Sequence, residues 1–108
     1  MTAKDFDKVV DELVSHACKT LKSKAGEYSR DTDRLSCFKR AAGVQQVTPS
    51  QALLGMMTKH VISIYDCITS GNKFTEAMAK EKIGDNINYL ILLYGLLKEE
   101  GFIEPDNK

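Results

Sequence analysis

The chain has 108 residues, and its 15 lysines and arginines balance 15 aspartates and glutamates, which gives a formal net charge of +0 at pH 7. This length fits one domain with a single core and argues against a multidomain enzyme. Zero net charge provides no general field to hold nucleic acid or an anionic membrane, so we expect neither as a partner.

The composition favours helices. With 2 prolines and no tryptophan, long uninterrupted helices are favoured over a β-sandwich, which needs frequent turns. Cys18, Cys37 and Cys67 are odd in number and widely spaced, which is typical of neither a disulfide framework nor a thiolate zinc site and fits a reducing compartment. The first residues lack the apolar core of a signal peptide. No apolar stretch approaches the length of ~18 residues that is needed to span a bilayer. We expect an all-α cytoplasmic protein with no membrane segment.

Two helices are predicted in the first part of the chain. Residues 4–25 repeat apolar side chains at helical spacing from Phe6 to Leu21, as an amphipathic helix does. A polar stretch then leads to a shorter expected helix over 32–42, which Gly43 ends.

Two longer helices are predicted in the second part. Thr48 followed by Pro49 is the strongest boundary signal, because threonine is a good N-cap and proline suits the first helical position. The third helix is therefore expected over 49–70, and apolar periodicity predicts a fourth over 75–100. Four helices with short links predict that the whole chain is one domain, a compact four-helix bundle.

The fourth predicted helix is apolar on nearly every side. Within residues 87–97, Asn88 and Gly95 are the only residues that are not apolar. A helix that is apolar all round must be covered all round, and three partners in so small a chain do not suffice. We expect a homo-oligomer, most simply a C2 dimer. The alternative is a central helix that its own chain covers.

Polar side chains on the fourth helix suggest a metal site. At about 100° per residue, Glu81, Asp85 and Asn88 fall within roughly 60° of one another. Carboxylates four residues apart can share a hard divalent cation such as Mg²⁺ with a third oxygen donor, either Asp66 or Asn88. The structural alternative is that Glu81 is a solvated acid and Asn88 bridges helices.

The third predicted helix carries a matching polar stripe. Lys59 and Asp66 belong to it, and His60 lies at its apolar margin. Two facing stripes would form a polar pocket inside the bundle. In the alternative reading, Asp85 pairs with Lys59 or Lys82, and His60 is a packed, hydrogen-bonded histidine.

The segment between the first two helices offers groups that suit a nucleotide. Tyr28 can stack on a base, and Arg34 can bind phosphate near a helix N-terminus. The alternative is that Tyr28 packs the loop onto the bundle while Arg34 pairs with Asp31 or Glu27.

Several of these motifs resemble known proteins. The run from Glu81 to Leu90, EKIGDNINYL, resembles the second metal helix of the MazG-like all-α nucleoside triphosphate pyrophosphohydrolases. A wider set of short motifs resembles small phage-encoded helical proteins grouped near those enzymes. That set lies within residues 20–98 and comprises 24–28, 33–38, 48–59 and 85–89.

The resemblance implies a chemistry. Those enzymes cleave a nucleotide between its α and β phosphates, using magnesium held by an E-x-x-E pair on one helix and an E-x-x-D pair on the next. By position, Asp85 matches the final aspartate, Lys82 stands where the glutamate would be, and Glu81 is one step away. The preceding helix offers Asp66 but no glutamate pair. The resemblance therefore implies either a single magnesium or nucleotide binding without hydrolysis.

The leading hypothesis is a nucleotide-handling protein with its site between the third and fourth helices, and whether it is an enzyme is left open. If it is one, a metal-bound water would attack. The first alternative is a non-catalytic helical module, phage-encoded and acting in the host cytoplasm, that binds a nucleotide or a host protein. The second is that the polar stripes only fix helix register. The assigned residues are Asp66, Glu81 and Asp85 for magnesium, and Tyr28, Arg34, Lys59, His60 and Asn88 for the nucleotide.

Overall fold

A computed structural model describes residues 1–28 and 33–106, with side chains for 1–23 and 33–106. This part of the chain contains no strand and four helices, α1 (Ala3–Tyr28), α2 (Ser36–Gln45), α3 (Pro49–Thr69) and α4 (Glu76–Glu99). The predicted all-α class with four helices is confirmed. None of these described helices is long and apolar enough to cross a membrane.

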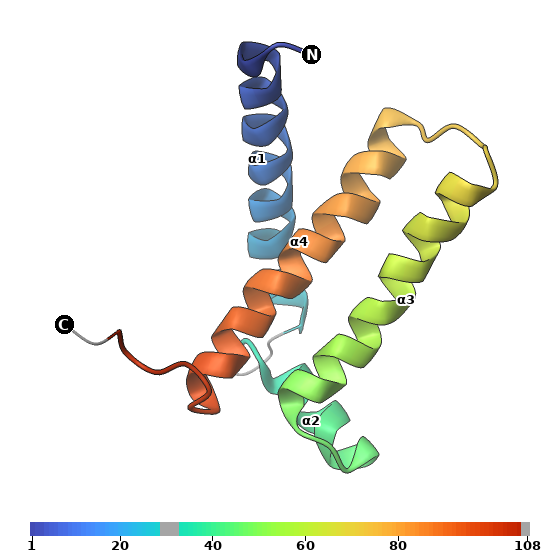
Figure 1. The fold of residues 1–108 in the computed structure, drawn as a ribbon. Helices are drawn as coiled ribbons and strands as arrows, with labels where there is room; N and C mark the ends of the chain where they lie inside the picture. Colours follow the sequence, from blue (N-terminus) through green and yellow to red (C-terminus); the bar gives the residue numbers. More distant parts are fainter. Residues whose placement is uncertain (29–32, 107–108) are drawn as a thin grey trace.

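α4 is the helix around which the others are arranged (Figure 1). It forms an antiparallel hairpin with α3 and is also contacted by α1, whereas α2 packs against α3. The N-terminal half of α1 diverges from α4, and residues 1–12 are all exposed.

Local capping explains where the two long hairpin helices begin. The Thr48 hydroxyl accepts a hydrogen bond from the Gln51 amide at 3.2 Å, and the Gln51 side chain accepts one from the Thr48 amide at 3.0 Å. This reciprocal capping box satisfies two amides that a helix start leaves unpaired. Thr75 caps α4 with a single bond, because its hydroxyl accepts from the Met78 amide at 3.1 Å. Both starts follow from threonine's preference for the N-cap.

α2 differs from its expected range of 32–42. It begins only at Ser36, because the Asp33 carboxylate accepts a hydrogen bond from the Leu35 amide at 3.0 Å and holds this segment in a turn. It continues past Gly43 and ends where Gln46 adopts a left-handed conformation, φ 57°. The glycine therefore did not mark the end of the helix.

The buried core is small and lies where α2, α3 and α4 meet. Phe38, Leu53 and Leu96 are its buried members, one from each helix. A second contact joins α1 to α4, where Ala17 is buried and a Cβ atom on Gly84 would lie 3.8 Å from the Ala17 Cβ. The core is completed by half-buried side chains, namely Leu35, Met56, Tyr89, Leu92 and Leu93.

The chain is more open than its length requires. Its radius of gyration is 16.2 Å, whereas about 13 Å is usual for this length. Its accessible surface is 8146 Å², whereas a folded monomer of this mass exposes about 6,000 Å². Much apolar surface on the long helices is therefore not covered by the chain itself.

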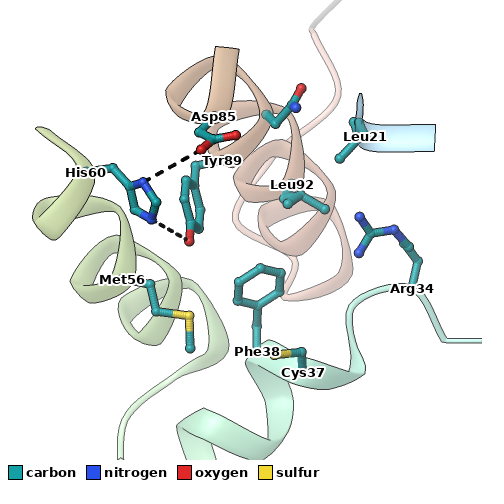
Figure 2. Close-up of a pocket in the computed structure, with 10 residues that line it drawn as sticks. Leu21, Arg34, Cys37, Phe38, Met56, His60, Asp85, Tyr89 and Leu92 are labelled. Atoms are coloured by element: carbon teal, nitrogen blue, oxygen red, sulfur yellow. Dashed lines mark hydrogen bonds and ion pairs between the residues drawn. The ribbon is translucent and has the colours of Figure 1, made fainter. Parts of the chain in front are cut away.

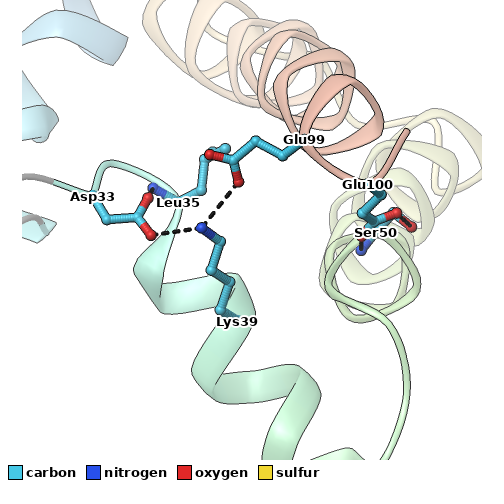
Figure 3. Close-up of polar contacts among 6 residues, drawn as sticks. All are labelled: Asp33, Leu35, Lys39, Ser50, Glu99 and Glu100. Atoms are coloured by element: carbon cyan, nitrogen blue, oxygen red, sulfur yellow. Dashed lines mark hydrogen bonds and ion pairs between the residues drawn. The ribbon is translucent and has the colours of Figure 1, made fainter. Parts of the chain in front are cut away.

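The C-terminal end of α4 is tied to the start of α3 (Figure 3). The Glu100 carboxylate accepts hydrogen bonds from the Ser50 amide at 2.9 Å and from the Ser50 hydroxyl at 2.7 Å. Ser50 lies in the first turn of α3, where unpaired amides and the helix dipole favour a negative charge. These two bonds hold the open end of the hairpin together.

The same end of α4 is tied to α2 (Figure 3). The Lys39 ammonium lies 2.6 Å from an Asp33 oxygen and 2.9 Å from a Glu99 oxygen. The hydrogen bond from Lys39, followed by that from the Leu35 amide, lowers the pKa of Asp33 below its ordinary value. The stabilising contribution of this carboxylate is therefore present at neutral pH and is lost as the pH falls through its lowered pKa.

Replacing Glu100 with alanine should lower the free energy of unfolding by about 2 kcal/mol, because two hydrogen bonds to a charged group are lost and Ser50 is buried. Urea denaturation measures this change. The control is Glu104→Ala, which removes an exposed glutamate with no described contact. Equal losses in the two variants would contradict the role given to Glu100.

Candidate functional site

A pocket of about 300 Å³ lies beside α4, where the end of α1, the start of α2 and the middle of α3 approach it. We call it the central pocket (Figure 2). Its apolar wall includes Leu21, Phe38, Met56 and Leu92. A pocket of this size with apolar walls and a few polar groups has the usual character of a small-molecule site.

His60 joins two polar residues of α4 across the helix hairpin (Figure 2). Its Nε2 atom lies 3.3 Å from the Tyr89 hydroxyl, and its ring centroid lies 5.0 Å from that of Tyr89. Its Nδ1 atom lies 4.0 Å from an Asp85 oxygen, an ion pair when the imidazole is protonated. Asp85 lies beside His60 and bonds neither Lys59 nor Lys82 among the described contacts, whereas Lys82 donates to Ser63 at 2.7 Å.

Asn88 is the unusual polar residue of the pocket. It is only 7% exposed, and its Oδ1 atom has no hydrogen-bond partner among the described residues. A buried polar atom without a partner costs about 1–3 kcal/mol, so such atoms in native proteins have a reason to be retained. Asn88 lines the pocket, but this oxygen is closed to solvent, as is the Oδ1 atom of Asn86, which also has no described partner and lines none of the described pockets.

Arg34 brings a positive charge to the same pocket. It precedes α2 and its guanidinium points toward the pocket, facing the side occupied by His60 and Asp85 (Figure 2). No described carboxylate pairs with it, and the pairings with Glu27 or Asp31 that the sequence allowed lie outside the described side chains. Guanidinium groups bind phosphate with two parallel hydrogen bonds. The central pocket therefore presents to an incoming anion a cation that has no partner among the described side chains.

A neighbouring hollow contains further residues expected in the site. It has a volume of about 440 Å³, and Lys59, His60, Glu81 and Asp85 all line it. Lys59 and Glu81 are exposed, whereas Asp85 is half-buried. His60 and Asp85 line both spaces, which places the hollow directly beside the central pocket.

The three acids expected to hold magnesium are not gathered into one cluster. Glu81 and Asp85 share the neighbouring hollow, but Asp66 is exposed on α3 and lines none of the described pockets. Among the described residues, no group of three His, Cys, Asp or Glu side chains could hold a metal ion. A three-acid site therefore does not fit the described residues.

The structure places Arg34, His60 and Asn88 in the central pocket together with Asp85. The side chain of Tyr28 lies outside the described residues. Sequence reasoning did not assign Tyr89 to the site, although its place four residues after Asp85 was a signal that both face the same way.

Comparisons of the chain with protein-family models, with curated proteins and with solved structures found no match.

Replacing Asn88 with leucine should leave the free energy of unfolding unchanged or raise it by up to about 1 kcal/mol, because the change removes an unpartnered buried oxygen at similar volume. Thermal denaturation without added ligand measures this. The matched control is Ser50→Ala, which removes the other polar side chain that is buried among the described residues and whose hydroxyl is hydrogen-bonded. It should destabilise the protein. A larger loss from Asn88→Leu than from Ser50→Ala would show that Asn88 is structurally satisfied.

Proposed function

We propose that the protein binds a nucleoside phosphate in the central pocket. The observation that supports this proposal is the Arg34 guanidinium, which has no described partner, in a pocket that is also lined by the carboxamide-bearing Asn88. An amide that can hydrogen-bond a base edge and a cation that can bind phosphate are the two kinds of group that nucleotide recognition needs.

The pocket walls suit the two halves of such a ligand. The guanidinium of Arg34 binds phosphate oxygens, and the apolar side chains of Phe38, Met56 and Leu92 contact the base. The His60 and Tyr89 rings, with centroids 5.0 Å apart, offer an aromatic surface to a base. The carboxamide of Asn88 then discriminates between bases through its donor and acceptor.

Magnesium fits this proposal as a companion of the phosphate. Mg²⁺ commonly uses one or two protein carboxylates and completes its coordination with substrate phosphates and water. Glu81 and Asp85 would hold it from the neighbouring hollow, where Lys59 adds a positive charge for the phosphates. When bound, the ion would neutralise phosphate charge.

The second candidate function is capture of the nucleotide without cleavage. The observation that favours it is the absence of a three-acid cluster in the described residues, together with Lys82 at the position where the resembled enzymes have a glutamate. Such a protein would act by sequestering the nucleotide, as a phage-encoded module in the host cytoplasm. The alternative for such a module is that it binds a host protein. The free thiols of Cys18, Cys37 and Cys67 favour a reducing compartment.

A thermal-shift screen of nucleoside mono-, di- and triphosphates, with and without magnesium, tests the proposal. A nucleotide at 100 times its dissociation constant should stabilise the folded protein by about 2.7 kcal/mol. Arg34→Gln should weaken binding at least tenfold, because the phosphate loses a charge-assisted contact.

The matched control is Arg40→Gln, an exposed arginine of α2 that lines none of the described pockets and should bind normally. Release of phosphate or pyrophosphate from the stabilising nucleotide separates the enzyme from the capture protein. The proposal fails if no nucleotide stabilises the protein, or if the two arginine variants lose affinity equally.

A further inference from the structure

The outer side of α3 carries an uncovered apolar stripe. Tyr65 is 66% exposed, Ile68 64%, Val61 49% and Leu54 47%. With the exposed Thr58, these residues recur at alternating steps of four and three, which is the heptad spacing of helices that pair along their length. The outer stripe of α3 therefore consists of Leu54, Thr58, Val61, Tyr65 and Ile68.

A second stripe with the same spacing runs along α4. Leu90 is 52% exposed, Tyr94 49% and Ile83 42%, and the half-buried Ile87 and Leu97 complete the series. Neither stripe contains a charged residue. We call these ten residues together the outer face of the hairpin.

Both stripes lie on the same side of the hairpin. At about 100° per residue, the stripe of α3 is centred about 150° from its α4-facing residues, which include Met56 and His60. The stripe of α4 is centred about 130° from its α3-facing residues, which include Lys82 and Tyr89. Viewed from the N-terminus of each helix, the rotation from the facing residues to the stripe has the same direction in α3 and α4. Because the two helices are antiparallel, rotations in the same direction place both stripes on the same side of the hairpin. In Figure 1 no other helix crosses the side of the hairpin that faces the viewer.

The chain leaves more surface uncovered than a closed monomer does. The chain exposes 8146 Å², roughly 2,000 Å² more than a closed monomer of its mass. A stable dimer buries about 800 Å² on each partner, and obligate dimers bury more. The excess belongs to the whole chain, including the exposed residues 1–12, and is large enough to contain an interface of this size on the outer face.

We propose that the outer face pairs with the outer face of a second copy of this chain across a two-fold axis. An uncharged apolar face with heptad spacing on both helices complements itself, which is the requirement for a two-fold interface. The central pocket is bordered by α1 and α2, away from this face, so each copy in the dimer keeps an open pocket.

Sedimentation equilibrium of the full chain over a hundredfold range of concentration tests the pairing. The natural chain, of 12.0 kDa, should sediment as a species of about 24 kDa. Val61→Glu, in the middle of the outer stripe of α3, should sediment at the monomer mass, because two carboxylates would meet in an apolar interface. Tyr65→Ala should weaken the dimer at least tenfold, and since Tyr65 is 66% exposed its loss leaves the protomer fold intact.

The control is Val44→Glu, at an apolar residue that is 86% exposed on α2 and lies outside the outer face. This variant should sediment as a dimer, as the natural chain does. Circular dichroism checks that each variant retains its helices, and if Val61→Glu unfolds, Tyr65→Ala decides the result. A natural chain that stays at the monomer mass would overturn the proposal and indicate a different occupant of the outer face. Outer-face variants that dimerise as well as Val44→Glu would overturn it too.

Discussion

The antiparallel pairing of α3 with α4 is the contact on which the rest of this structure depends. It buries Leu53 and Leu96, and it is closed at one end by the bonds from Ser50 to the Glu100 carboxylate. The same pairing brings His60 against Tyr89, 29 residues later in the chain. Both the small core and the polar centre of the pocket therefore result from one helix hairpin.

α4 is divided lengthwise into faces with different roles. One face contacts α3 and supplies Asp85 and Tyr89 to the pocket, while a second contacts α1 through Gly84. The third face, with Leu90 and Tyr94, is left uncovered. Because a helix with apolar residues on every side needs cover on every side, this division connects the proposed site to the proposed dimer.

Much of the helical architecture was predictable from local signals in the sequence. Thr48 and Pro49 predicted the start of α3, since capping and proline geometry act within one helical turn. The start of α2 was harder, because it depends on the side chain of Asp33, which bonds both the Leu35 amide and Lys39. Contacts of this kind leave no periodic pattern in the sequence.

The site was only partly predictable, for geometric reasons. Asp85 and Asn88 could be placed on one helix face from their spacing, but which residues of α3 face them depends on how the two helices rotate against each other. Asp66 lies about 120° round the helix from His60, and so it is exposed while His60 contacts α4. The meeting of Arg34 with these residues depends on the path of the chain between α1 and α2, which periodicity does not give.

The proposed function requires the buried Asn88 carboxamide to contact the bound ligand. Nuclear magnetic resonance of the side-chain amide groups, during titration with a nucleoside triphosphate and magnesium, tests it most directly. The Asn88 side-chain signals should shift with the saturation of binding, while those of Asn72, exposed in the turn between α3 and α4, should stay in place. Saturable binding that leaves the Asn88 signals unmoved would show that Asn88 does not contact the ligand.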